Sequence, residues 1–129
     1  KAHPVRGAQM LAGVKFLEKA TDLVRHHHER VDGKGYPDGL RGDEITVGAK
    51  IVNVADAFDA MTTDRPYRAG LTAEEAMAQL QSKAGTQFAA EVVEVFVVAV
   101  RDGRIRLIKN TTPYQGSEQG AAAWSRGIA

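Results

Sequence analysis

Apolar residues recur at three- and four-residue steps through most of the chain, which is the spacing of one face of an α-helix. Residues 4–14 and 16–27 both show this spacing, and Pro4 suits the first turn of a helix. The spacing returns over residues 50–62, where the side chains expected to point inward are Ile51, Val54, Ala55, Phe58 and Met61. The pattern therefore predicts three helices in the first half of the chain.

Two further helices are predicted in the second half. Thr72 followed by Glu75 forms a capping box, in which each side chain bonds a backbone N–H group of the other residue, so a helix begins there. Its buried side is expected to consist of Ala73, Ala76, Met77, Leu80 and Ala84. The valine-rich run 89–101 has strand propensity, but its length and the stop at Asp102-Gly103 favour a buried helix.

The remaining segments lack helical periodicity. Residues 31–48 hold five glycines and a proline, which indicates an ordered loop. Residues 104–109 alternate as a short strand would, and residues 110–129 are polar and aperiodic, as in a linker or a mobile tail. We therefore expect one all-α domain over residues 1–109, followed by that tail.

Composition adds constraints on function. The 129 residues are 43% hydrophobic and 26% charged, which is ordinary for one compact globular domain. A formal net charge of +1 argues against a surface for polymeric nucleic acid or for membranes, although seven cations fall between Arg25 and Arg68. The absence of cysteine excludes disulfides and thiolate metal sites and is compatible with the cytoplasm. No apolar run approaches the length of a membrane span.

Candidate metal ligands flank the loop. His27 and His28 are consecutive, so on a helix their side chains diverge by about 100° and can address two metal ions, or one metal ion and its substrate. A bare histidine pair is also common at solvated helix ends. Asp56 favours the metal site, because it lies in a helix with a buried pattern, where an unpaired carboxylate is costly. His26 falls beside charged residues on the helical wheel and is expected to point to water.

The loop and the arginines beyond it suit a phosphate ester. Over residues 33–39 the chain reads Gly-Lys-Gly-Tyr-Pro-Asp-Gly, where glycine permits a positive φ and proline restricts the backbone. Tyr36 can thus present a fixed face to a nucleobase, or it can be the core residue of a structural turn. Arg65 and Arg68 follow the helix that carries Asp56 and can clamp a phosphodiester through paired donors, with surface salt bridges as the alternative.

In order and spacing, the motifs between His3 and about Phe96 resemble the HD-GYP family, bacterial hydrolases of the signalling dinucleotide cyclic di-GMP. The resemblance implies an all-α, HD-superfamily helical bundle, of which this chain is the C-terminal part without the N-terminal helices that carry the His-Asp dyad. It implies that the metal ligands are His3, His27, His28 and Asp56. It also implies that the substrate is bound by Tyr36, Arg65 and Arg68. We expect Glu29 and Asp59 to support these groups, with Asp59 orienting a neighbouring histidine or arginine.

The resemblance implies a cofactor and partners as well. The cofactor is two or three divalent metal ions, and the histidine–carboxylate ligand set suits iron or manganese at least as well as zinc. The substrate is cyclic di-GMP, the products are pGpG or GMP, and the natural protein carries an upstream sensor or receiver domain, as in two-component response regulators. Since the chain begins at Lys1 and not at methionine, we expect it to be a piece of a longer protein, inactive alone and prone to homodimerise through uncovered apolar surface.

One departure from the family bears on stability. Phe88-Ala89-Ala90 stands where the family has Phe-Asp-Pro, so the last helix lacks a capping aspartate, at a cost of about 1 kcal/mol. Two alternative functions stay open. One is a catalytically degenerate module of the same fold that senses a nucleotide or binds a protein, and the other is an HD-type hydrolase for another phosphate ester. The Gly-Tyr-Pro loop argues against the second.

Overall fold

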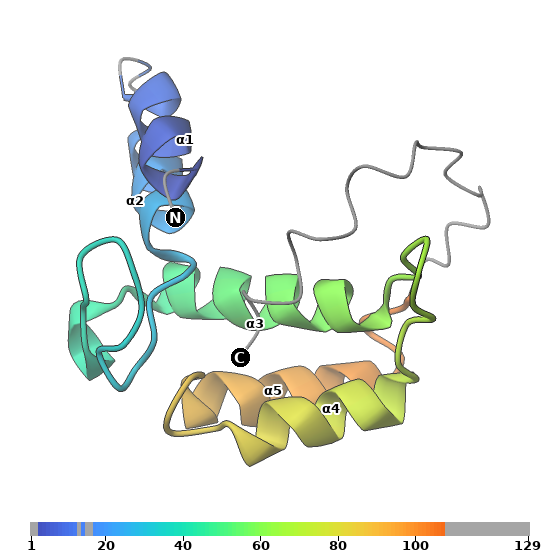
Figure 1. Ribbon diagram of the computed structural model, residues 1–129. Coiled ribbons are helices and arrows are strands. Elements are labelled where there is room, and N and C mark those ends of the chain that lie inside the picture. Colours follow the sequence, from blue (N-terminus) through green and yellow to red (C-terminus); the bar gives the residue numbers. More distant parts are fainter. Residues whose placement is uncertain (1–2, 13, 15–16, 108–129) are drawn as a thin grey trace.

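A computed structural model describes residues 3–12, 14 and 17–107, and throughout this part the regular structure is helical (Figure 1). The helices are α1 (His3–Leu11), α2 (Glu18–His26), α3 (Val47–Thr62), α4 (Ala73–Ser82) and α5 (Ala90–Arg101). A single-turn 3₁₀-helix, η2 (Gly42–Glu44), lies in the loop between α2 and α3. The predicted all-α class is confirmed, and the valine-rich run is a helix. None of the described helices is long and apolar enough to cross a membrane.

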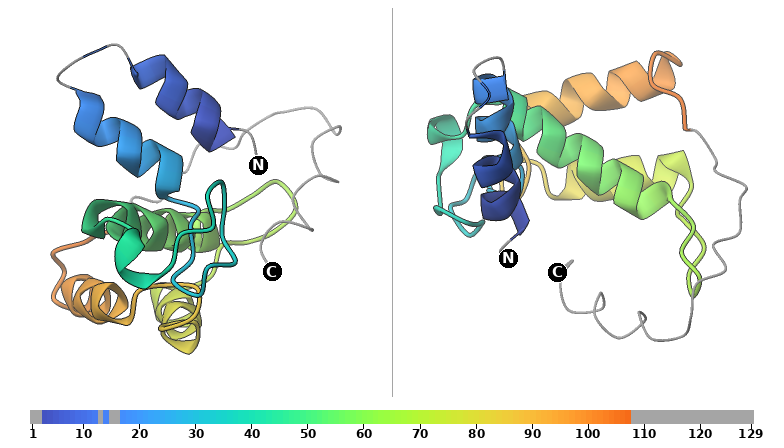
Figure 2. Two further views of the ribbon diagram at one scale, coloured as in Figure 1. Left: turned by 90° about the vertical axis from the view of Figure 1, so that its left-hand side faces the viewer. Right: turned by 90° about the horizontal axis from the view of Figure 1, so that it is seen from above.

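Helix α3 lies at the centre of the molecule. Helices α4 and α5 pack against one side of it, whereas α1 and α2 form a hairpin that stands on the other side, near the beginning of α3 (Figures 1 and 2). The loop after α2 runs from the base of this hairpin to the start of α3. Phe16, at the start of the second predicted helix, lies outside the described residues.

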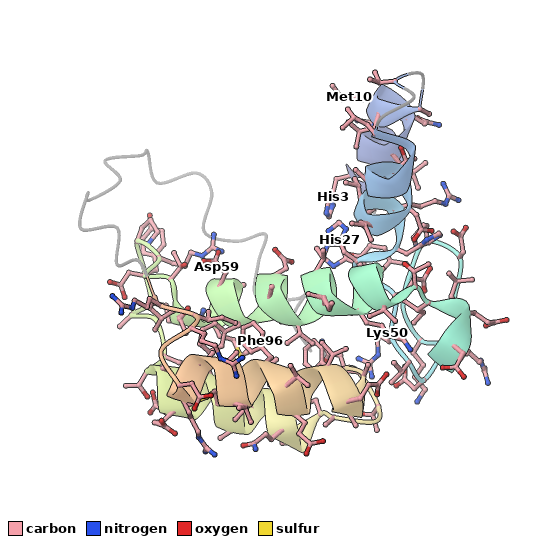
Figure 3. All side chains as sticks on the ribbon, turned by 180° about the vertical axis from the view of Figure 1, so that it is seen from behind. His3, Met10, His27, Lys50, Asp59 and Phe96 are labelled. Atoms are coloured by element: carbon pink, nitrogen blue, oxygen red, sulfur yellow. The ribbon has the colours of Figure 1, made fainter. Side chains whose placement is uncertain are left out.

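The hydrophobic core lies between α3, α4 and α5. Its buried members are Val54, Phe58, Ala76, Met77, Leu80, Phe88, Val93, Phe96 and Val97. The rings of Phe58 and Phe96 meet edge to face, with centroids 5.1 Å apart, and Figure 3 shows Phe96 between α3 and α5. The predicted inward residues of α4 all belong to this core or pack against it.

The predicted inward stripe of α3 is wrong at Ile51, which is 48% exposed. Lys50 occupies the stripe instead, one turn before Val54, and only 7% of it is exposed. Its ammonium group lies 3.5 Å from the carboxylate of Glu91 and 3.7 Å from that of Asp43. The two carboxylates compensate the burial of the charge.

Side-chain caps define where α3 and α4 begin. Helix α3 starts at Val47, earlier than predicted, because the hydroxyl of Thr46 accepts the backbone N–H of Ala49 at 3.4 Å. The predicted capping box of α4 is complete. The Thr72 hydroxyl accepts the N–H of Glu75 at 3.2 Å, and the Glu75 carboxylate accepts the N–H of Thr72 at 2.9 Å. Helix α5 begins with no side-chain cap, as its alanines predict.

The strand predicted over residues 104–109 is wrong in its described part. Residues 104–107 form turns and irregular backbone after α5. The N–H groups of Arg104 and Ile105 both donate to the carbonyl of Ala99, at 2.9 and 3.1 Å, which folds this segment back onto the helix end. The predicted tail, residues 110–129, lies outside the described residues.

We predict that Thr72→Ala lowers the free energy of unfolding by about 1 kcal/mol, because it leaves the backbone N–H of Glu75 at the start of α4 without its acceptor. Chemical denaturation followed by circular dichroism measures the change. Thr63→Ala is the matched control, since that hydroxyl makes only an exposed 3.4 Å contact with Asp59 at the end of α3. Equal losses in the two variants would contradict the role of the cap.

Candidate metal centre

Three histidines meet at the base of the α1–α2 hairpin. His3 begins α1, whereas His27 and His28 follow directly after α2, and one nitrogen of each ring lies within 4.8 Å of the others. The Nε2 atoms of His3 and His28 are 3.0 Å apart. Figure 3 shows His3 and His27 on the side of the hairpin that faces α3. The hairpin therefore brings together three of the four residues predicted as metal ligands.

The protonation of these rings fits a metal ion. The Nδ1 atom of His27 lies 2.8 Å from the carbonyl oxygen of Val24. Because a carbonyl only accepts, Nδ1 carries the proton and Nε2 keeps its lone pair for a metal. Burial lowers the pKa of His28 to about 4, the neighbouring His27 and His3 act in the same direction, and Asp56 opposes them. His28 is therefore neutral at pH 7, which is the form that ligates metals.

Asp56 approaches this cluster from α3. Its negative charge opposes the lowering of the His28 pKa. Burial raises the pKa of Tyr36, and the charge of Asp56 raises it further. The prediction that Asp56 has buried surroundings is wrong, since the residue is exposed. The reason is that α4 and α5 cover only the opposite side of α3. Among the described residues, Asp56 also stands outside the set of ligand atoms that lie within 4.8 Å of one another.

The Gly-Tyr-Pro loop places its tyrosine against the cluster. The ring of Tyr36 stacks on that of His28, with centroids 5.0 Å apart and an interplanar angle of 25°. The loop can come this close because Gly35 has no side chain. A Cβ atom there would clash with backbone atoms of Glu29 and Arg30. The tyrosine is half-buried and lines the histidine cluster, although this geometry leaves its contact with a substrate as a prediction.

Glu29 fixes the backbone of the same loop. It is only 1% exposed, and its carboxylate accepts the backbone N–H groups of Asp38, Gly39 and Leu40 at 2.6, 3.0 and 3.1 Å. The side chain of Asn53 on α3 donates to the Glu29 carbonyl at 2.6 Å. A buried carboxylate with three N–H donors is a strong anchor. Glu29 thus supports the histidines by fixing the loop backbone.

The prediction that His26 points to water is wrong. Its side chain is 14% exposed, and its two ring nitrogens each lie 2.8 Å from a carboxylate, one of Asp22 and one of Asp38. Arg25 makes two 2.8 Å bonds to Asp38, and Arg25 and His26 together lower the pKa of that carboxyl to about 2. Asp22 also accepts the hydroxyl of Thr46 at 2.6 Å. This cluster ties α2 to the loop and to the cap of α3.

Sequence reasoning passed over three of these supporting residues, Arg25, Asp38 and Asn53. Each acts across elements that are distant in the sequence, so helical periodicity gives no sign of it. A weak signal existed for Asp38, because a carboxylate inside a glycine-rich loop is close to backbone and cationic donors.

The predicted phosphate-binding arginines lie beyond the C-terminal end of α3. Arg65 and Arg68 are both exposed, and their backbones pair through two hydrogen bonds of 2.8 and 3.1 Å. The guanidinium of Arg68 donates to the carbonyl of Ala60 at 3.1 Å, which turns it back toward α3. Asp59 accepts the hydroxyl of Thr63 at 3.4 Å and lies on the same side of α3 as the histidine hairpin (Figure 3).

Known proteins are similar to this chain in sequence. A cyclic di-GMP phosphodiesterase of Pseudomonas aeruginosa is 41% identical over 101 residues, which cover 78% of this chain and 24% of that protein. The response regulator RpfG of Xanthomonas campestris, a cyclic di-GMP phosphodiesterase, is 40% identical over 99 residues, covering 75% of this chain and 26% of RpfG. The chain thus spans about a quarter of the length of the curated relatives it matches.

Solved structures agree on the fold. A cyclic GMP-AMP specific phosphodiesterase of Vibrio cholerae superposes with a TM-score of 0.67 at 25% identity, over 78% of this chain and 23% of that one. An HDGYP protein of Bdellovibrio bacteriovorus, at 23% identity and a TM-score of 0.63, covers 78% of this chain and 31% of its own and supports the fold alone. The HD domain family matches residues 1–92. The chain therefore belongs to the HD domain family.

Proposed function

We propose that the protein carrying this chain is a metal-dependent phosphodiesterase that hydrolyses cyclic di-GMP to pGpG or GMP in bacterial second-messenger signalling. The observation that carries the proposal is the cluster of His3, His27 and His28 with the Tyr36 ring stacked on it. Relatives are named for cyclic di-GMP or for the mixed dinucleotide cyclic GMP-AMP. This supports a cyclic purine dinucleotide as the substrate class.

The donor set fits a metal-dependent reaction. Phosphodiesterases of this family depend on metal ions. In this proposal the ligands in the chain are His3, His27 and His28, with Asp56 adding a carboxylate from α3, and the ions are two or three of iron or manganese. When bound, such ions supply a hydrolytic nucleophile at neutral pH and stabilise negative charge on the phosphate. The neutral His28 and the Nε2 lone pair of His27 are prepared to hold them.

The remaining residues position the substrate. Tyr36 is proposed to contact a nucleobase, and Arg65 and Arg68 supply guanidinium donors to the phosphates. Glu29 keeps the loop of Tyr36 in place because its carboxylate accepts three backbone N–H groups of that loop. Asp59, at the same end of α3 as the arginines, is proposed to orient them.

The context of the chain belongs to the same proposal. It comprises the C-terminal portion of the catalytic domain over residues 1–109, a linker or mobile tail over residues 110–129, an upstream sensor or receiver domain, a homodimer and a cytoplasmic location. Exposed valine and isoleucine side chains on two helices favour burial against another part of the protein or a second copy. They are Val47 and Ile51 on α3, and Val95 and Val98 on α5. With at most four protein ligands, the 129-residue chain alone is expected to be inactive.

A second candidate is a nucleotide-binding module without turnover. The observation that favours it is the position of Asp56, which is exposed and stands outside the group of histidine ligand atoms. Metal content measured together with turnover separates the two candidates, because a pure sensor binds cyclic di-GMP and releases it unchanged.

We predict that Asp56→Ala, in the protein at its natural length, removes metal and abolishes cyclic di-GMP hydrolysis while the fold stays intact. The fold is expected to survive because the side chain is exposed on the side of α3 opposite the core. Elemental analysis, circular dichroism and chromatography of the products measure the three quantities. Asp102→Ala, an exposed aspartate at the end of α5, is the control and should retain both metal and activity. Full metal content in Asp56→Ala would remove Asp56 from the ligand set.

We predict that Arg65→Ala and Arg68→Ala each raise the dissociation constant for cyclic di-GMP roughly tenfold or more, because a hydrogen bond to a charged group contributes about 1.5–3 kcal/mol. Metal content should not change, since guanidinium does not ligate cations. Titration calorimetry measures the affinity. Arg104→Ala, an exposed arginine beyond α5, controls for loss of charge alone. Wild-type affinity in both variants would refute the clamp.

A further inference from the structure

An exposed tyrosine stands at the tip of the turn that joins the two arginines. The loop between α3 and α4 protrudes from the end of α3 (Figures 1 and 2). The N–H of Arg65 donates to the carbonyl of Arg68 at 2.8 Å, and the reverse bond is 3.1 Å. This pairing leaves Pro66 and Tyr67 as the two central residues of a closed turn, where proline suits the first position. Tyr67 is 65% exposed there.

The turn is fixed at its base. The N–H of Gly70 donates to the carboxylate of Asp64 at 2.7 Å, and the N–H of Leu71 donates to the carbonyl of Met61 at 2.8 Å. A side chain at Gly70 would clash with the carbonyl of Thr62, so the two arms of the loop are in close contact. Because its base is fixed, the tip of this turn loses little conformational entropy when a ligand binds, and this favours binding.

The chemistry of the tip matches one nucleotide unit. Arg65 and Arg68 are the cations proposed to bind phosphate, and Tyr67 lies between them in the chain. In any nucleotide the base is joined to its phosphate through a single ribose, so a ring beside a phosphate contact is within reach of the base. An aromatic side chain next to cations is the combination on which proteins stack nucleic-acid bases. A lone exposed tyrosine would mean little, and the two flanking arginines are what make it informative.

We propose that Tyr67 is a nucleobase platform, whose ring stacks on a purine of the cyclic dinucleotide while Arg65 contacts the adjoining phosphate. The proposal rests on the proposed function and deepens it, because it assigns a base contact beyond the C-terminal end of α3, separate from Tyr36 beside the histidines. Stacking uses the π face that every base has, so Tyr67 recognises a purine without distinguishing guanine from adenine.

The test compares two substrates in the protein at its natural length, loaded with manganese or ferrous iron. Cyclic di-GMP carries purines, whereas its abasic analogue, in which hydrogen replaces each base, keeps the two phosphodiesters without any aromatic ring. Tyr67→Ala should raise KM for cyclic di-GMP about fivefold or more, the lower end of the effect of removing one base–aromatic stack. KM for the abasic analogue and kcat for both substrates should stay within about twofold. If cyclic GMP-AMP is turned over, Tyr67→Ala should raise KM for it by the same factor as KM for cyclic di-GMP.

Conservative variants separate the ring from the fold. Tyr67→Phe keeps the ring and should behave as the wild type, whereas Tyr67→Leu keeps an apolar side chain without a ring and should behave as Tyr67→Ala. Thermal melts of all three should match the wild type, because the side chain is exposed. If Tyr67→Ala does not fold, Tyr67→Leu takes its place.

Four results would overturn the platform. They are an unchanged KM for cyclic di-GMP in Tyr67→Ala, an equal rise in KM for both substrates, a loss in Tyr67→Phe equal to that in Tyr67→Ala, and a matching loss of stability. If the wild type hydrolyses neither substrate, the proposed hydrolysis fails and calorimetric binding of cyclic di-GMP decides. Weaker binding by Tyr67→Ala than by the wild type would then support the platform, and equal binding or no binding would refute it.

Discussion

The buried carboxylate of Glu29 is the interaction on which the geometry of the candidate metal centre depends. A charge with 1% exposure is tolerated only where donors surround it, and three consecutive backbone N–H groups of the loop provide them. Those N–H groups need an acceptor for the same reason. The loop and the carboxylate therefore stabilise each other. In the resulting conformation of the loop, the ring of Tyr36 stacks on that of His28. A histidine pair and a tyrosine thus form one surface, which neither α2 nor the loop could form alone.

One side of helix α3 contributes to the stability of the core, and another side carries candidate functional residues. One of its sides packs into the core with α4 and α5. Asp56 and Asp59 are exposed, and Figure 3 shows Asp59 on the same side of α3 as the hairpin. Carboxylates on the open side keep their hydration and carry no desolvation cost. The cluster of His26, Asp22 and Asp38 joins α2 to the loop and to Thr46 at the start of α3 through hydrogen bonds. Close packing adds to them, because a side chain at Gly48 on α3 would clash with Leu23 on α2.

Much of the fold follows from the sequence alone, because the signals are local. Helical spacing of apolar residues, the capping box at Thr72 and Glu75, and glycines at turns each act within a few residues of the chain. The same holds for the histidine pair and for the Gly-Tyr-Pro loop, whose residue types and spacing indicated a metal and a phosphate ester before any contact was known. Only the presence of these groups could be predicted in this way. Their distances, tautomers and exposure could not.

Tertiary structure decided which polar groups are buried and what they meet. His26 contradicts the helical wheel because Asp38 from the loop holds it, and Lys50 is buried beside the carboxylates of Glu91 on α5 and Asp43 in η2. Asp56 is exposed although its helix has a buried pattern, because α4 and α5 cover only one side of α3. The physical reason is common to all three. Periodicity reports the average polarity of a helix face, whereas the cost of burying a charge depends on partners that come from distant parts of the chain.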